Sequence, residues 1–212
     1  ARRLSLVALC EIGDVDGVNF VLRWDRKQVD RPAQALLLPP SMKTVASDLA
    51  YCPLAAACLA GNEEIVMILL SEGANINSAS SPRNWAPIHF AAFSGNTGIF
   101  DLLLRHGADP QHESAGDTPL GLALVSGDEE SVSVVLEHVS HGDPQWPWND
   151  PVAFAKSLHG GSPEVVKKFL KEGFDVNSNL SPFSTDGHWV NAPSVIALSD
   201  TPQRNLIPVL AE

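Results

Sequence analysis

The chain has 212 residues, of which 44% are hydrophobic and 18% are charged, and its formal net charge is −11. This composition excludes a disordered polar chain, and no apolar run approaches the 18 residues that a membrane-spanning helix needs. Residues 41–145 hold 3 basic and 13 acidic residues, a balance of −10, so most of the excess charge lies there. Such a segment argues against nucleic-acid binding; it favours either a basic partner or simple solubility.

The three cysteines, Cys10, Cys52 and Cys58, are odd in number and have no metal-like spacing. They predict small core side chains in a reducing compartment, the cytoplasm or the nucleus, rather than a disulfide framework. The N-terminus has no pattern of a signal peptide. Because the chain starts at Ala1 without a methionine, we expect a fragment of something longer.

The first predicted unit covers residues 1–24, where two apolar blocks flank Gly13. Residues 25–46 follow as an insertion, since the distance from Gly13 to the equivalent Gly61 exceeds the later spacings by about one half. This insertion contains "RPAQALLLPPSMK", and we expect a surface loop anchored by Leu36 to Leu38.

Three similar segments come next, each with a proline, a short apolar block, a glycine and a second apolar block. Their prolines are Pro53, Pro87 and Pro119, and their glycines are Gly61, Gly95 and Gly127. The proline spacings are 34 and 32, and a further 32 leads to Pro151. A fixed period of this length indicates stacked repeats, because one short unit cannot bury both of its faces.

The clearest copy spans residues 81–110. The pair Ala91-Ala92 allows a first helix to pack close to its neighbour. Gly95 suits a tight turn that needs a positive φ, and Gly107 suits the end of the second helix. Between these glycines, Ile99, Phe100 and Leu102 to Leu104 form a broad apolar surface, which is typical of a helix sandwiched between two repeats.

The C-terminal part of the chain contains two further units. The segment 145–177 has a recognisable helix pair, and 187–212 is a weaker copy whose second helix should be kinked by Pro208. The sequence thus predicts one domain, 1–212, with degenerate outer repeats. Its units are approximately 1–24, 47–77, 81–110, 113–143, 145–177 and 187–212.

These motifs, in this order, resemble the ankyrin repeat family. The resemblance implies an all-α solenoid of stacked helix-turn-helix units with hairpin-like finger loops. It also implies that His89 makes a structural hydrogen bond to the turn, and that partners bind on a concave surface of fingers and first helices. The fingers would be 47–52, 81–86, 113–118, 145–150 and 187–192.

Catalytic and metal-binding motifs are missing from the sequence. It contains no His-Glu-x-x-His, no paired Cys-x-x-Cys and no Gly-x-Ser-x-Gly. We therefore predict a non-catalytic protein with no cofactor and no metal.

Large aromatic residues are concentrated in the predicted fingers, although loops favour small polar residues. Tryptophan and tyrosine are enriched at binding hot spots, and an acid beside them suits a basic peptide. The candidate partner-binding residues are Tyr51, Arg83, Trp85, Phe93, Asp117, Trp146, Trp148 and Trp189. The alternative is that these aromatics pack between neighbouring fingers.

The preferred hypothesis is a monomeric protein–protein interaction module that binds a basic protein or peptide, without nucleic-acid binding or membrane insertion. A second hypothesis is a regulatory or substrate-docking part of a larger enzyme or channel. A third is a reader of histone tails, with methyl-lysine in an aromatic cage. A purely structural spacer is the last alternative, and the finger tryptophans weigh against it.

Overall fold

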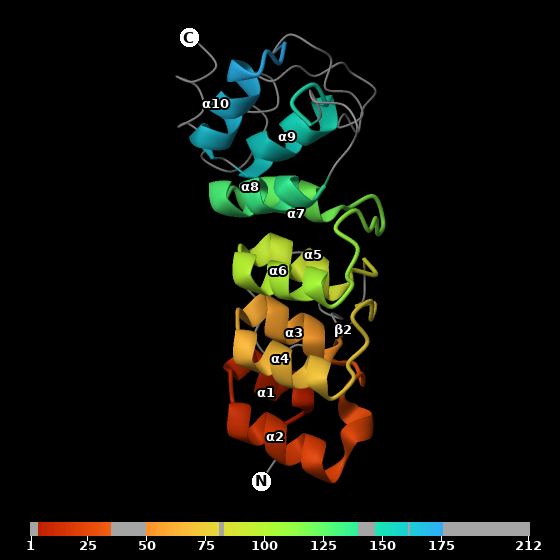
Figure 1. Cartoon of the computed structure of the whole chain (residues 1–212). Helices are drawn as coiled ribbons and strands as arrows, with labels where there is room; N and C mark the ends of the chain where they lie inside the picture. The colour runs from red at the N-terminus through yellow and green to blue at the C-terminus, as the bar shows by residue number, and fades with distance from the viewer. Residues whose placement is uncertain (1–3, 35–49, 81–82, 140–146, 161, 176–212) are drawn as a thin grey trace. The chain divides into compact units, whose positions relative to one another are not determined.

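The computed structural model of the chain describes residues 4–34, 50–80, 83–139, 147–160 and 162–175 (Figure 1). The chain forms two compact units, Ala1–Pro119 and Leu120–Glu212. The predicted last repeat, 187–212, and the anchor predicted at Leu36 to Leu38 lie outside the described residues.

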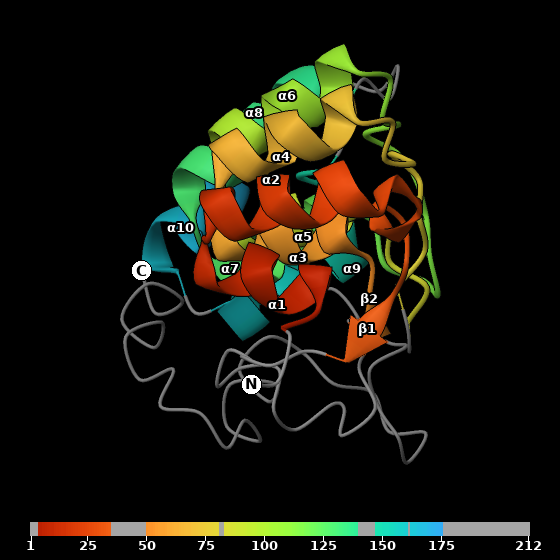
Figure 2. The same ribbon diagram turned by 90° about the horizontal axis from the view of Figure 1, so that it is seen from below.

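The first unit contains three helix pairs. These are α1 (Leu6–Ile12) with α2 (Val15–Trp24), α3 (Pro53–Ala60) with α4 (Glu63–Ser71), and α5 (Pro87–Ser94) with α6 (Thr97–Arg105). The first helices α1, α3 and α5 pack side by side in one layer, and α2, α4 and α6 form a second layer (Figure 2). The structure confirms the predicted stack of helix-turn-helix units.

Each pair turns at a glycine with a positive φ: 75° at Gly13, 76° at Gly61 and 76° at Gly95. An L side chain is disfavoured there, so glycine closes the turn without the steric cost that a Cβ brings. Gly61 has a second reason, because a Cβ at this position would lie 2.9 Å from Oδ1 of Asn96 in the next repeat.

The core lies between the two helix layers and between successive pairs. Helix α3 is buried from Pro53 to Cys58 because it lies between α1 and α5 and carries small apolar side chains. Helix α6 buries Ile99, Phe100 and Leu103, whereas Leu102 and Leu104 are half-buried. The apolar surface of α6 is therefore broad, as its sequence predicts.

Part of the predicted insertion is regular structure. A 3-10 helix, η1 (Arg26–Gln28), precedes the strand β1 (Ala33–Gln34), which pairs antiparallel with β2 (Ala50–Tyr51). Val29 is buried, and an Asp30 carboxylate oxygen accepts a hydrogen bond from the Asn75 N–H at 2.8 Å. The hydrogen bond between Asp30 and Asn75 joins residues 45 positions apart, so residues 25–34 contain short regular elements and a long-range contact that local pattern does not predict.

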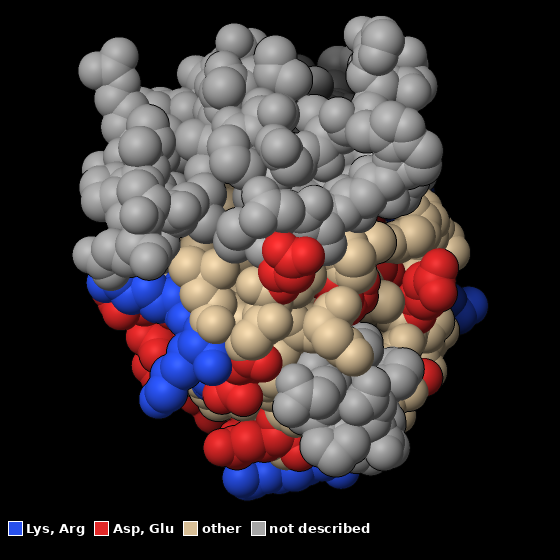
Figure 3. All heavy atoms as spheres, turned by 90° about the horizontal axis from the view of Figure 1, so that it is seen from above, with Lys and Arg blue, Asp and Glu red and all other residues tan. Residues whose placement is uncertain are grey.

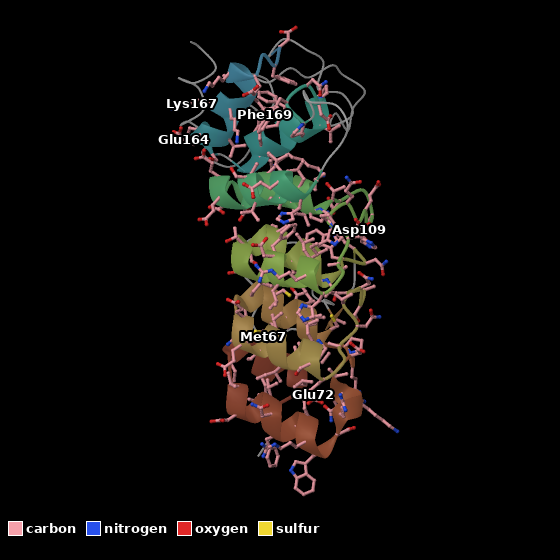
Figure 4. The ribbon with its side chains drawn as sticks, in the orientation of Figure 1. Met67, Glu72, Asp109, Glu164, Lys167 and Phe169 are labelled. Atoms are coloured by element: carbon pink, nitrogen blue, oxygen red, sulfur yellow. The ribbon has the colours of Figure 1, made fainter. Side chains whose placement is uncertain are left out.

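The second unit contains α7 (Pro119–Ser126), α8 (Glu129–His138), α9 (Pro151–Gly160) and α10 (Pro163–Lys171). Gly127 has φ 74°, and a Cβ there would lie 2.6 Å from the carbonyl oxygen of Gly160, so the two turns approach closely. Phe169 of α10, labelled in Figure 4, packs on Phe154 with ring centroids 5.4 Å apart.

Charged side chains of both signs are interspersed on the surface. On α10, Glu164 and Lys167 form an exposed ion pair at 3.3 Å (Figure 4). In the space-filling view of Figure 3, acidic and basic side chains lie beside one another along the left and lower edges of the coloured part, whereas much of its middle is uncharged. At the end of α4, Glu72 pairs with Arg26 at 2.9 Å.

Candidate functional site

Two finger loops of the first unit are hairpins whose tips need left-handed backbone. One is closed by the bridge Ser80↔Trp85 and the other by Ser114↔Asp117. The second is a two-residue turn with φ 52° at Ala115 and φ 81° at Gly116, which is the pattern of a type I′ turn. The hairpin-like fingers that the sequence predicts are therefore present here.

Asp117 links the two fingers through its side chain. Its Oδ2 accepts hydrogen bonds from Nη1 of Arg83 at 2.8 Å and from Nε1 of Trp85 at 3.1 Å. The Arg83 side chain stays 49% exposed, whereas that of Asp117 is 15% exposed. Three of the predicted partner-binding residues, Arg83, Trp85 and Asp117, thus lie together. Their polar groups bond to one another rather than pointing into solvent.

His89 also forms hydrogen bonds with one residue of each of these two fingers. Its side chain is fully buried, and its Nδ1 accepts a hydrogen bond from the Ala86 N–H at 3.2 Å. Nε2 therefore carries the proton and donates to the Asp117 carbonyl oxygen at 3.3 Å. These bonds are the structural role that the resemblance implies for His89.

Burial lowers the pKa of His89 below its ordinary value of 6.5. The hydrogen bond to the Asp117 carbonyl raises this pKa, and the neighbouring His112 ring lowers it. Because burial has the largest effect, the neutral imidazole is the form that the fold stabilises.

The ring of Trp85 is surrounded by the protein itself. Trp85 is only 9% exposed; His89 stacks on it at 6.3 Å between centroids, and Phe90 meets it edge-on at 5.4 Å. The Arg83 guanidinium lies 6.0 Å from its centroid, and Phe93 packs at 6.1 Å. Among the described residues, the aromatics around Trp85 pack on one another and leave no open cage for a methylated lysine.

Tyr51 is also an internal residue. Its side chain is fully buried and meets Phe90 edge-on at 5.2 Å. Burial, together with the charge of Glu11, raises the pKa of its phenol. The ring of Tyr51 therefore packs in the core and presents no surface to a partner in this structure.

The remaining candidates are three tryptophans, of which only Trp148, in the second unit, lies within the described residues. Trp148 is half-buried, packs edge-on against Phe169 at 5.0 Å and lies under Nζ of Lys168 at 5.1 Å. Trp146 and Trp189 lie outside the described residues. Trp148, like Trp85, packs against side chains of its own chain, as the alternative to partner binding predicts.

The finger-to-finger hydrogen bonds also involve residues that sequence reasoning missed. The Ser114 hydroxyl donates to the Asn84 carbonyl oxygen at 2.6 Å, and the Cys52 N–H donates to Oγ of Ser80 at 3.2 Å. Both serines stand at the first position of a finger hairpin. That shared position is the signal that would have found them.

Cys52 serves as the N-cap of α3, where its sulfur accepts a hydrogen bond from the Ala55 N–H at 3.3 Å. A thiol here takes the place of the hydroxyl or carboxylate that usually caps a helix. Burial raises the pKa of Cys52, and it raises the pKa of Cys10 to about 12. These thiols therefore stay protonated near neutral pH, which disfavours nucleophilic reactivity.

Within the described residues, no cluster of three or more His, Cys, Asp or Glu side chains is placed to hold a metal ion. None of the helices in this part of the chain has the length and apolar character needed to cross a bilayer.

A family model of ankyrin repeats in three copies matches residues 29–114 and, in a second placement, residues 54–145. Together these matches span 29–145, which is more than half of the 212 residues. The chain belongs to the ankyrin repeat family. This confirms the resemblance and the all-α repeat fold. Ankyrin repeats are in general protein–protein interaction modules and are typically non-catalytic, and the matched span contains α3 to α8 with both described fingers.

Proposed function

We propose that this ankyrin repeat protein binds a basic segment of another protein on the finger and first-helix surface of its first unit. The observation that carries the proposal is the bonding between successive fingers. Asp117, Ser114 and Ser80 each make hydrogen bonds that tie one finger to the next. A surface held in this way is preorganised, so a partner orders few loops when it binds.

The exposed residues on this surface are different from the buried aromatics. Arg83 is half exposed, and Phe93 is half-buried at the end of α5. Leu59 occupies the same position of α3, two residues before its turn glycine, and is also half-buried. Because α3 and α5 are packed neighbours, Leu59 and Phe93 occupy equivalent positions on adjacent helices, and in this proposal the partner covers them as an apolar strip. Trp85 and Asp117 support this strip and position Arg83.

The charge of the segment supports a basic partner. Residues 41–145 carry a balance of −10, from 3 basic and 13 acidic residues. Arg83 adds little positive potential because Asp117 pairs with it at 2.8 Å. The exposed acids Asp109, labelled in Figure 4, and Glu113 flank the second finger. Complementary charge of this kind steers association and disfavours acidic partners.

The test compares the wild type with Phe93→Lys and with the matched control Met67→Lys. Met67 is 51% exposed on α4, in the other helix layer (Figure 4), so its variant adds the same charge away from the proposed surface. Each protein is immobilised and exposed to lysate of the host cell, and the captured proteins are quantified by mass spectrometry. The dissociation constant of each captured protein is then measured at two salt concentrations.

We expect the wild type and the control to capture the same basic protein and Phe93→Lys to bind it at least about tenfold more weakly. The affinity should fall with added salt. Equal capture by all three proteins would overturn the proposed surface. Capture of an acidic partner, or binding that salt does not weaken, would overturn the proposed partner chemistry.

A further inference from the structure

The outer face of α2 carries the two most exposed large apolar side chains in the described part of the chain. Trp24 is 79% exposed and Phe20 is 60% exposed, and their ring centroids lie 6.1 Å apart. They are four residues apart and so lie one helical turn from each other. We call Asp16, Phe20, Arg23 and Trp24 the α2 face.

The α2 face points away from the core of its own repeat. Helix α2 packs on α1 and α4 through Val18 and Leu22, which are buried. Phe20 is two residues from each of them, or roughly 200° around the helix, so it lies on the opposite side. Two adjacent aromatic rings left in water are costly, because their apolar surface stays exposed.

The charges on this face are arranged so that it complements itself. Asp16 lies in the first turn of α2 and Arg23 in its last turn, and both are exposed. Neither residue forms an ion pair with any other residue that the structure describes. When two α2 helices lie antiparallel around a two-fold axis with each Asp16 facing the Arg23 of the other copy, the axis passes between residues 19 and 20. The two Phe20 rings then meet at the centre, each Trp24 ring lies toward the N-terminal end of the other α2, and the helix dipoles are antiparallel.

We infer that the α2 face binds a second copy of this chain and forms an antiparallel, two-fold symmetric dimer. The surface is separate from the fingers, so the inference does not depend on the proposed function. One 10-residue helix is about 15 Å long, which makes the interface smaller than that of a stable dimer. We therefore expect a dissociation constant on the order of 100 µM, so that the chain is monomeric when dilute.

Sedimentation equilibrium of the full chain, from about 10 µM to about 1 mM, tests the dimer. The wild type should convert from monomer to dimer over this range. Phe20→Glu/Trp24→Glu should raise the dissociation constant at least about tenfold, whereas Met67→Glu on α4 should leave it unchanged. All of these side chains are more than half exposed, so the variants should keep the wild-type melting temperature. A wild type that stays monomeric throughout would overturn the inference.

A charge swap tests the antiparallel arrangement. Asp16→Arg alone and Arg23→Asp alone should each weaken the dimer, because like charges then meet across the two-fold axis. The double variant Asp16→Arg/Arg23→Asp should restore it, since both copies change together. An equimolar mixture of the two single variants should form a heterodimer. If the double variant is as weak as the singles, the antiparallel pairing is wrong.

Discussion

At the scale of single residues, Ala115 occupies a backbone conformation that alanine seldom adopts. Its φ of 52° precedes φ 81° at Gly116 in the two-residue turn between Ser114 and Asp117. Asn-Gly is the preferred sequence for such a turn, and a left-handed alanine costs about 1 kcal/mol. The finger therefore carries local strain at its tip.

Ala115→Asn should relieve part of that strain. We expect the free energy of unfolding, measured in urea, to rise by roughly 0.5–1 kcal/mol. Ala115→Val is the matched control and should lower it, because a β-branched residue tolerates a positive φ less well. An asparagine variant no more stable than the wild type would show that the turn is relaxed with alanine.

His89 makes the stability of the fold depend on pH, because burial lowers its pKa. The folded protein favours neutral His89, so the unfolded chain takes up the proton first as the pH falls. This contribution to stability is complete above about pH 6.5 and is lost below it, by at most about 1.4 kcal/mol per pH unit.

Urea unfolding of the wild type and His89→Gln at pH 7.5 and 5.5 measures this effect. The other histidines titrate in both proteins, so the wild type should lose more stability between the two pH values than the variant does. Equal losses in the two proteins would contradict a lowered pKa at His89.

At the scale of elements, the local sequence pattern predicts where the helix pairs form. It does not predict how closely the backbones of neighbouring repeats approach each other. Gly98 in α6 and Gly160 at the end of α9 are both helical glycines. A Cβ at Gly98 would lie 3.6 Å from a Glu63 carboxylate oxygen, an ordinary contact. A Cβ at Gly160 would overlap the carbonyl oxygen of Leu124 in the neighbouring repeat. The two glycines look alike in sequence and differ in their tertiary surroundings.

Gly98→Ala and Gly160→Ala should therefore change stability in opposite directions. We expect Gly98→Ala to stabilise by up to about 1 kcal/mol through helix propensity. Gly160→Ala should destabilise by about 2 kcal/mol or more, because two backbones must move apart. Urea unfolding followed by circular dichroism measures both, and a neutral Gly160→Ala would contradict the close approach of these turns.

At the scale of the whole molecule, two electrostatic effects of opposite sign compete. The net charge of −11 produces self-repulsion, which salt screens. Salt also weakens exposed ion pairs such as Arg83–Asp117 and Arg26–Glu72, and each of these contributes no more than about 1 kcal/mol.

We expect the self-repulsion to dominate, because the excess charge is concentrated within residues 41–145. The melting temperature should then rise as NaCl increases from about 10 mM to about 150 mM, where the Debye length is about 8 Å. A melting temperature that falls over this range would mean that these ion pairs outweigh the self-repulsion of the net charge.

The sequence by itself determined the repeat architecture of this ankyrin repeat protein. Its period and the turn glycines depend on residue types at short spacings, and those local rules hold wherever the segment lies. The role of His89 was implied by the resemblance to the family. Whether an aromatic side chain is buried was decided only by the tertiary structure. Trp85 is buried against Phe90 and Phe93, and Asp117, 32 residues later, accepts its indole N–H. Trp24 is exposed because it lies on the side of α2 opposite Val18 and Leu22, which pack in the core. Exposure depends on neighbours that are distant along the chain, and local pattern cannot place them.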